Sequence, residues 1–438
     1  MSTRILMLLW LMASPLAAED GGGDADRYWP QWRGPRATGT GPHADPPVQW
    51  SEQEHIRWKV PLPGRGHSTP VIWGDRIFLT TAIAYGDGLE PRYSGAPGAH
   101  DNSPVTQHHK FEVLAVDRRD GHILWQRTVC EALPHEGGHT SGSMASSSPV
   151  TDGEHLFAFF GSRGIYCLDL EGKPVWSDDL GHMQTKHGHG EGSSPALYGK
   201  TLLINWDHEG QSFVIAYDKA SGKRRWKIDR REVTSWASPI VVEHAGIAQV
   251  IVSGTDRVRS YDLANGRVIW ACGGLSANVV ASPVAGDGMV YAASSYEKRA
   301  LLAIQLEGAA GDITSTEQVL WSRRHRTPYV PSPLLYGRWL YFLSHYQGIL
   351  SRVEARTGAE ALGPFRLEPI RNVYASPVGA AGRIYITDLD GTTMVISHGG
   401  EPKVLAINRL EDIFSASAAL VDKELVLRGL EYLYCIVE

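Results

Sequence analysis

Short apolar runs alternate with turn-forming residues along almost the whole chain. In one example, the turn Trp73-Gly74-Asp75 leads into the apolar run Arg76-Ile77-Phe78-Leu79, and further runs of similar length follow it. Runs of this size, bounded by Gly, Asp, Ser and Pro, are typical of β-strands. The pattern therefore predicts an all-β chain of short strands joined by tight turns.

The apolar runs belong to a repeating unit that starts at a serine next to a proline. Successive starts after the second are 46, 44, 44, 50, 44 and 41 residues apart. A spacing of about 40–50 residues is typical of one propeller blade, built as strand, turn, strand, loop, strand, turn, strand. The starts predict eight blades and are Ser68-Thr69-Pro70, Ser148-Pro149, Ser194-Pro195, Ser238-Pro239, Ser282-Pro283, Ser332-Pro333, Ser376-Pro377 and the degenerate Ser417-Ala418.

A second signature marks the later half of each unit. An Asp and a Gly form a tight turn before an outer strand that carries a tryptophan, as in Ala115–Trp125, Ala216–Trp226 and Ser260–Trp270. A side chain of that size on the outer strand is expected to dock on the neighbouring blade. Trp176 and Trp321 fit the pattern, whereas the sixth and seventh units lack the tryptophan, which leaves their outer strands uncertain.

The two ends of the repeat region complement each other. The last unit stops at its third strand, Tyr432–Val437, while His55–Val60 precedes the first unit and carries Trp58. Arg57–Val60 is therefore predicted to pair beside Tyr432–Val437 and to complete the last blade. Such closure removes the unpaired sheet edges of an open ring. The predicted fold is an all-β, eight-bladed β-propeller of four-stranded antiparallel blades.

These motifs resemble the tryptophan-docking repeat of the pyrroloquinoline-quinone (PQQ) repeat proteins, in the quinoprotein alcohol dehydrogenase-like superfamily. The resemblance runs from about Trp29 to Glu438, and the opening Tyr28–Pro35 is similar to that of an exported bacterial subgroup. The family's dehydrogenases carry a vicinal disulfide and calcium-binding and catalytic carboxylates, and no residue of this chain matches those one by one. The resemblance thus implies the fold more strongly than the redox activity.

The N-terminus has the layout of a secretory signal. A start containing Arg4 leads to the apolar run Ile5–Met12 and then to small residues before Glu19, with cleavage expected after Ala18. The apolar run is shorter than the ~20 residues of a membrane span. We expect residues 1–18 to be a signal peptide, 19–54 an N-terminal extension and 55–438 the propeller, in a soluble periplasmic or extracellular protein without a membrane anchor.

The net charge and the cysteines limit which kinds of partner and bond the chain is expected to have. The net charge of −6 gives no basic footprint for nucleic acid. The four cysteines, Cys130, Cys167, Cys272 and Cys435, show no metal spacing, and none follows the signal where a lipoprotein would need one. Buried unpaired thiols and a monomeric protein are expected, with no bond between Cys167 and Cys435.

One face of the predicted propeller is much richer in functional groups than the other. Strand parity places the loops between second and third strands on the same face as the loops that connect blades, and these hold twelve of the 18 histidines, His100 and His139 among them. The turns of the opposite face, such as Thr151–Glu154, are ordinary turn formers. A ligand funnel is therefore predicted on the first face, with candidate residues His187, His189, Glu191, Asp207, His208, Trp236, Tyr329, His345, Tyr346, Tyr374, Asp388 and Asp390.

Several functions fit this funnel. His187, His189 and Glu191, with Asp207 and His208, would suit a divalent metal or acid–base chemistry, and the aromatic residues, with Phe414, would suit a sugar or a planar cofactor. No nucleophile elbow or phosphate loop is present. The preferred function is a binding or scaffold propeller for a carbohydrate, peptide or protein. The alternative is an enzyme, either polysaccharide-active or quinone-dependent, and neither PQQ nor a metal is the expected cofactor.

Overall fold

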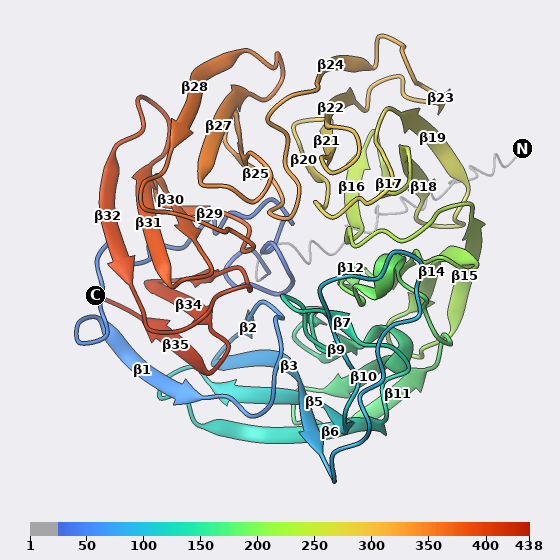
Figure 1. Cartoon of the computed structure of the whole chain (residues 1–438). Helices are drawn as coiled ribbons and strands as arrows, with labels where there is room; N and C mark the ends of the chain where they lie inside the picture. Colours follow the sequence, from blue (N-terminus) through green and yellow to red (C-terminus); the bar gives the residue numbers. More distant parts are fainter. Residues whose placement is uncertain (1–24) are drawn as a thin grey trace, which may run out of the picture.

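The computed structural model describes residues 25–438, so the predicted signal peptide lies outside the described residues. These residues form eight β-sheets arranged in a ring around a central axis (Figure 1). Each sheet contains four antiparallel strands in sequence order from the axis outward, apart from the last. The predicted all-β, eight-bladed propeller is confirmed.

The first four blades follow the chain from near residue 71 to residue 273. Blade 1 carries a long insertion between β3 and β5, and β23 (Gly311–Asp312) adds to blade 4 in parallel with its outer strand. Their strands are β2 (Val71–Trp73), β3 (Arg76–Tyr85), β5 (His108–Asp117) and β6 (Ile123–Ala132); β8 (Val150–Thr151), β9 (His155–Phe159), β10 (Ile165–Asp169) and β11 (Pro174–Asp178); β12 (Ala196–Tyr198), β13 (Thr201–Trp206), β14 (Ser212–Asp218) and β15 (Arg224–Arg230); and β16 (Ile240–His244), β17 (Ile247–Ser253), β18 (Arg257–Asp262) and β19 (Val268–Gly273).

The last four blades complete the ring. The sixth and seventh blades have their outer strands despite the missing tryptophan, although β28 pairs with β27 with two shifts in register. Their strands are β20 (Val284–Gly286), β21 (Met289–Ser294), β22 (Ala300–Gln305) and β24 (Val319–Arg323); β25 (Leu334–Tyr336), β26 (Trp339–Leu343), β27 (Ile349–Glu354) and β28 (Glu360–Arg366); β29 (Val378–Ala380), β30 (Arg383–Thr387), β31 (Thr392–Ser397) and β32 (Val404–Arg409); and β33 (Ala419–Val421), β34 (Glu424–Arg428), β35 (Tyr432–Ile436) and β1 (Ile56–Pro61).

Two further kinds of short element lie in the loops. The strands β4 (Asn102–Ser103) and β7 (Gly138–His139) pair with each other outside the blades. The 3₁₀ turns η1 (Gly161–Arg163) and η2 (Lys186–Gly188) follow β9 and β11. Within residues 25–438, no helix has the length and apolar character needed to cross a membrane.

The outer-strand tryptophans dock on the neighbouring blade as predicted. The Trp176 indole N–H donates to the carbonyl of Lys219 in the next blade at 2.8 Å. The ring also covers Gly222, whose φ is +69° and where a Cβ would come within 2.6 Å of the indole. The glycine of the repeat therefore serves two purposes, because it closes a left-handed turn and leaves room for the docked ring. The same N–H to carbonyl bond is made by Trp58, Trp125, Trp226 and Trp321. The indole N–H of Trp270 differs, because it donates to Gln249 Oε1 of its own blade at 3.0 Å.

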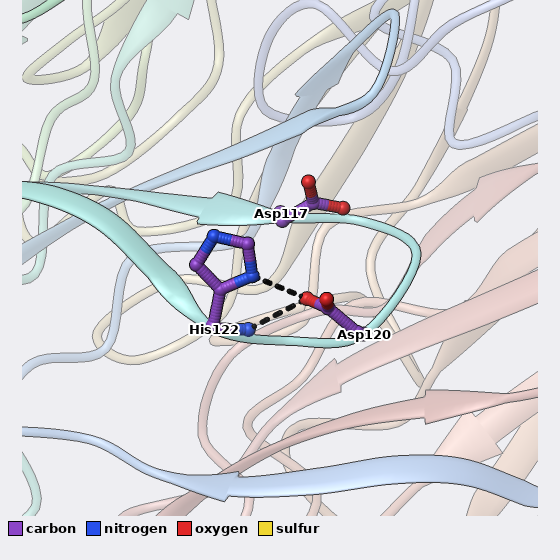
Figure 2. Close-up of side chains that lie close together, drawn as sticks. All are labelled: Asp117, Asp120 and His122. Atoms are coloured by element: carbon purple, nitrogen blue, oxygen red, sulfur yellow. Dashed lines mark hydrogen bonds and ion pairs between the residues drawn. The ribbon is translucent and has the colours of Figure 1, made fainter.

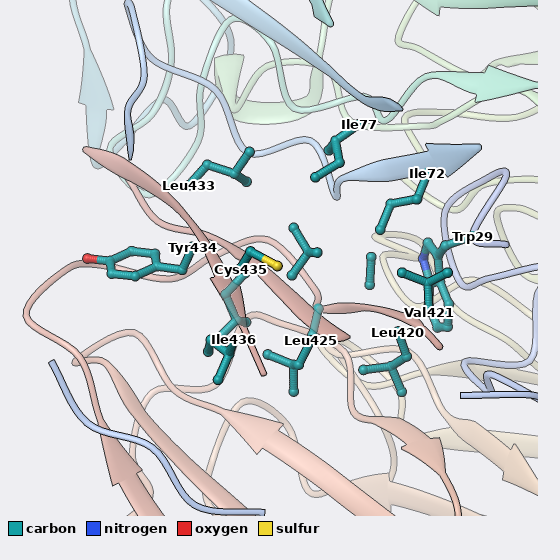
Figure 3. Packing of buried hydrophobic residues seen from close by; sticks show 14 of the residues in the cluster. Trp29, Ile72, Ile77, Leu420, Val421, Leu425, Leu433, Tyr434, Cys435 and Ile436 are labelled. Atoms are coloured by element: carbon teal, nitrogen blue, oxygen red, sulfur yellow. The ribbon is translucent and has the colours of Figure 1, made fainter. Parts of the chain in front are cut away.

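The ring closes between the first and last blades. Strand β1 pairs antiparallel with β35, with Trp58 opposite Cys435, so the predicted closing strand is present. Figure 3 shows the apolar cluster at this junction, where Ile72 and Ile77 of blade 1 face Leu425 and Ile436 of blade 8. These side chains are fully buried. Their burial and the strand pairing together hold the two ends of the chain in one body.

The N-terminal extension crosses the propeller axis on the face opposite the long loops. The Trp29 backbone bridges to Ile72 in blade 1, and the backbone of Gly39 accepts from Gly379 in blade 7. Between them, the buried Arg33 donates to the carbonyls of Pro333 and Pro377. The extension thus ties blades 1, 6 and 7 together, and this face is not as plain as the sequence suggested.

All four cysteines are free, including Cys167 and Cys435. Cys167, Cys272 and Cys435 are buried, as expected, and burial raises the pKa of the Cys167 thiol to about 12. Cys130 is only half-buried, which corrects the prediction of four buried thiols. Its strand β6 is the exposed outer strand of blade 1, so one side of the strand meets solvent.

Candidate functional site

A ring of serine side chains surrounds the axis where the inner strands begin. The backbone N–H of each repeat serine donates to the Oγ of the next blade's serine at 2.8 to 3.0 Å. The same bond joins Thr69 of blade 1 to Ser148. The serine that marks each repeat in the sequence therefore links neighbouring blades, a role that the sequence analysis did not assign. The ring consists of Ser148, Ser194, Ser238, Ser282, Ser332, Ser376 and Ser417.

An arginine joins blades 8 and 1 at this level. The buried Arg428 guanidinium donates to the Ser68 hydroxyl and, at 2.7 Å, to the carbonyl of Thr80. Burial lowers the pKa of Arg428 to about 9. Its charge is met by carbonyl and hydroxyl oxygens, and the adjacent His67 ring lies at the edge of the space above.

That space is an axial funnel of about 430 Å³. Its floor is formed by the serine ring and by Trp32 of the N-terminal extension, which also lines a cavity of about 360 Å³ on the other face. Trp32 therefore stands between the two spaces. The funnel lies on the predicted face, and eight of the twelve candidate residues line it: His187, His189, Glu191, Trp236, Tyr329, His345, Tyr346 and Tyr374.

One wall of the funnel is aromatic and comes from blades 5 to 7. The Tyr329 ring stacks on His345 with centroids 4.6 Å apart and on Tyr296 at 5.6 Å, and Tyr346 stacks on Tyr374 at 6.1 Å. The Tyr329 hydroxyl accepts from Asn278 Nδ2 at 3.2 Å. Tyr296 and Asn278 belong to this wall and were missed, because no spacing in the sequence links them to the axis.

The opposite wall carries four histidines from three loops of blades 1 to 3. His187 and His189, expected together, are joined by His100 of the β3–β5 insertion and by His139 of β7. Ring centroids of neighbouring pairs lie 4.8 to 5.4 Å apart. Burial, followed by the neighbouring His139, lowers the pKa of His189 to about 4, so this imidazole is neutral at pH 7.

Glu191 is the single carboxylate among the described funnel residues, and it is tied to the loop below. Its Oε2 accepts from the Ser162 backbone N–H at 2.7 Å, and its Oε1 accepts from the Ser162 hydroxyl. Burial is the main cause that raises the pKa of Glu191 to about 7. Glu191 and Glu136 also border a small cavity of about 50 Å³ behind the funnel wall.

Asp207 and His208 do not join His187 and His189, which corrects the predicted five-residue constellation. The buried Asp207 forms an ion pair with the buried Arg230 at 3.0 Å and accepts from Ser235 at 2.7 Å. The ring nitrogens of His208 contact the backbone of Gln184, Gly210 and Gln211. Both side chains therefore hold loops together, because their polar groups are occupied by an arginine, a serine and backbone groups.

Asp388 and Asp390 lie outside the funnel as well. The buried Asp388 carboxylate accepts from the backbone N–H groups of Arg371, Asp390 and Thr392 at 2.9 to 3.1 Å, so it organises the β30–β31 loop. The pair borders a separate depression near Arg409. Phe414, expected at the mouth, is fully buried in the core of blades 7, 8 and 1. The sequence placed these residues in the correct loops but could not give their depth.

Two acidic turns on the opposite face bring carboxylates and a histidine together. In Figure 2, His122 Nδ1 and the His122 backbone N–H both contact Asp120 Oδ1. The third member, Asp117, already accepts from the backbone and side chain of Arg119. This is the tight turn of the repeat signature, and its acceptors are occupied by its own loop. The second turn, Asp152–Glu154–His155, joins β8 to β9, and its Asp152 forms an ion pair with Lys219 of blade 3 at 2.6 Å.

The funnel does not fit the quinone that the family resemblance implies. PQQ is a polycarboxylate, yet no lysine or arginine side chain lines the funnel in the described part of the chain. The cofactor's calcium requires several oxygen ligands, and the one funnel carboxylate is held by Ser162. The four free cysteines include no adjacent pair. The described lining of the funnel therefore lacks the groups that would hold PQQ and its calcium.

Comparison with known proteins agrees with the fold. The crystal structure of BamB from Moraxella catarrhalis superposes with a TM-score of 0.54 at 13% identity and covers 82% of this chain and 99% of its own. A europium-containing methanol dehydrogenase gives a TM-score of 0.61 at 11% identity, with 93% and 91% covered. A quinohemoprotein alcohol dehydrogenase from Pseudomonas putida gives 0.56 at 11% identity, with 94% and 81% covered.

At these identities the likeness shows a shared propeller fold and nothing more. No curated protein sequence matches the chain. The family model PQQ_2, described as outer membrane protein assembly factor BamB, matches residues 109–362, which is more than half of the chain. The chain, with its eight PQQ-like blades, therefore belongs to this family of β-propellers.

Proposed function

We propose that this protein is an exported binding propeller that holds a carbohydrate in its axial funnel. The observation that carries the proposal is the composition of the funnel: an aromatic wall, a floor of serine hydroxyls and, in the described residues, no cationic side chain. Sites for small ligands combine apolar area with a few convergent polar groups in a concave space. This funnel has that combination on the scale of a short saccharide.

The chemistry of a sugar matches both the aromatic wall and the serine floor of the funnel. The C–H face of a pyranose ring is apolar and packs on aromatic rings such as Tyr346 and Tyr374, whereas its hydroxyls need neutral donors and acceptors. The half-buried Tyr329, Tyr346 and Tyr374 offer that platform beside serine hydroxyls. A peptide with charged termini or side chains finds no counter-charge there except the Glu191 carboxyl.

Export is supported by the signal-like start of the sequence and by the family description, which names an outer-membrane assembly factor. A scaffold role in outer-membrane protein assembly, which the family description suggests, would not require a small-molecule ligand in the funnel. A saccharide ligand and a scaffold role therefore make different demands on the funnel residues.

The test is saccharide binding by the full mature chain. Glycan-array screening followed by calorimetry should identify an oligosaccharide ligand, and Tyr346→Ala should weaken its binding roughly tenfold, which corresponds to about 1.4 kcal/mol. Tyr93→Ala is the matched control, because Tyr93 is 69% exposed and does not line the funnel. Binding that is lost equally in both variants, or a screen without any saccharide ligand, would refute the proposal.

An enzymatic role is the second candidate, and Glu191 favours it. A carboxyl whose pKa is raised to about 7 is suited to general acid–base catalysis near neutral pH. Glu191→Gln keeps an acceptor for the Ser162 backbone N–H. If the funnel cleaves its saccharide, this variant should bind it normally and release no product, whereas a binding protein would leave the saccharide intact with either residue.

A further inference from the structure

In three of the four histidines of this wall, one ring nitrogen bonds to a backbone carbonyl and the other has no hydrogen bond to the protein. His187 Nδ1 contacts the carbonyl of Pro97 at 3.0 Å, and His100 Nδ1 contacts that of Gly98 at 2.7 Å. His189 Nε2 contacts the carbonyl of His100 at 3.3 Å. Each carbonyl accepts a ring N–H and so fixes the tautomer, which leaves His187 Nε2, His100 Nε2 and His189 Nδ1 with free lone pairs.

This pattern is the one found around metal-binding histidines. A ligating imidazole commonly donates its second ring N–H to a backbone carbonyl, which orients the ring and makes the other nitrogen more basic. His139 packs edge-on against His189 with centroids 4.9 Å apart and supports that ring from the side.

The three loops that carry these rings are held together by backbone bonds. β4 pairs with β7, the His139 N–H donates to the carbonyl of His189 at 3.1 Å, and Asn102 Nδ2 donates to that of His187 at 2.7 Å. His187 itself has a φ of +58°, which is strained for a residue other than glycine. The surrounding contacts keep a histidine at a position where the backbone favours glycine.

We propose that His100, His187 and His189 bind one divalent transition metal ion, Zn²⁺ in the first place, at the mouth of the funnel. Imidazole nitrogens bind Zn²⁺, Cu²⁺ and Ni²⁺ well. Three protein nitrogens leave a fourth position facing the funnel, open to water or a ligand hydroxyl. This proposal stands apart from saccharide binding, since the ion alone should bind.

The rings must move slightly to hold the ion. The groups of described residues whose donor atoms already lie within 4.8 Å of one another are the turns Asp117–Asp120–His122 and Asp152–Glu154–His155, not the histidine wall. Zn–N bonds of about 2.0–2.1 Å therefore require the imidazoles to rotate inward. His187 and His189 are half-buried and His100 is exposed, so the rings can turn toward one another on their solvent side while each keeps its bond to a carbonyl. The two turns are the competing sites that an experiment must separate.

The experiment is calorimetric titration of Zn²⁺ into the chelator-treated mature chain, prepared without a histidine tag. One ion per chain is expected, and His187→Gln with His189→Gln should weaken binding by about 100-fold or more. His122→Gln is the matched control and should bind as the parent does. The absorption spectrum of the Co²⁺-loaded protein should show tetrahedral coordination in the parent and in the control, and should lose it in the double variant.

Three results would overturn the proposal. These are the absence of stoichiometric binding of Zn²⁺, Cu²⁺ or Ni²⁺ to the parent, unchanged binding in the double variant, and loss of binding in His122→Gln. If the double variant does not fold, His100→Gln replaces it, because the His100 ring is exposed and its nitrogen contacts only its own loop. Retained zinc affinity in that variant would also count against the site.

Discussion

Replacement of Gly222 by alanine tests the blade-docking mechanism most directly. The new Cβ would lie 2.6 Å from Cδ2 of Trp176 and 2.8 Å from its Cγ, so the indole ring must shift away from residue 222. Gly199→Ala is the matched control: its φ is +54°, against +69° at Gly222, but a Cβ there would meet nothing within 4 Å. The two variants share the backbone cost and differ in the contact with the ring.

The expected difference follows from these contacts. Placing alanine at positive φ costs about 1–2 kcal/mol in both variants. In Gly222→Ala alone, overpacking against the indole costs about 1–3 kcal/mol more. The shift of the ring also weakens the 2.8 Å hydrogen bond from the Trp176 N–H to the Lys219 carbonyl. We therefore expect the free energy of unfolding to be about 1–3 kcal/mol lower in Gly222→Ala than in Gly199→Ala.

The assay is urea unfolding followed by far-UV circular dichroism and tryptophan fluorescence. A double-mutant cycle completes it: with Trp176→Ala in the background, Gly222→Ala should cost no more than Gly199→Ala, because the ring it strikes is gone. Equal losses for the two glycine variants in the parent background would refute the reasoning. So would an extra cost at Gly222 that persists without Trp176.

Two further outcomes concern titratable groups. Burial, with Arg428 and Arg65 nearby, lowers the pKa of His67 to about 3 from about 6.5, so its stabilising effect is present above pH 6.5 and is lost as the pH falls toward 3. Thermal melts should show about 1–2 kcal/mol of this loss by pH 5, and His67→Gln should reduce it. With a thiol reagent, Cys130 should be labelled in the native protein and Cys167 only after unfolding, since burial raises the Cys167 pKa to about 12 and shields the sulfur. Rapid native labelling of Cys167 in mass spectra would contradict the described packing.

The sequence alone determined the architecture, because each blade repeats the same local physics. The serine starts, the Asp and Gly turns and the docking tryptophans recur at a spacing that only a ring of similar sheets accommodates. The missing last strand and the strand around Trp58 then predicted how the ring closes, and β1 does pair with β35. Strand parity also predicted which face carries the funnel.

Only the tertiary structure decided which loop residues meet. Asp207 and His208 lie in a loop on the same face as His187, yet Asp207 pairs with a buried arginine and His208 bonds to backbone groups. His100 comes from a different blade and reaches the same wall through an insertion whose path no local pattern encodes. Propensity and periodicity act over a few residues, whereas the depth and direction of a loop side chain depend on packing between blades that are distant in sequence.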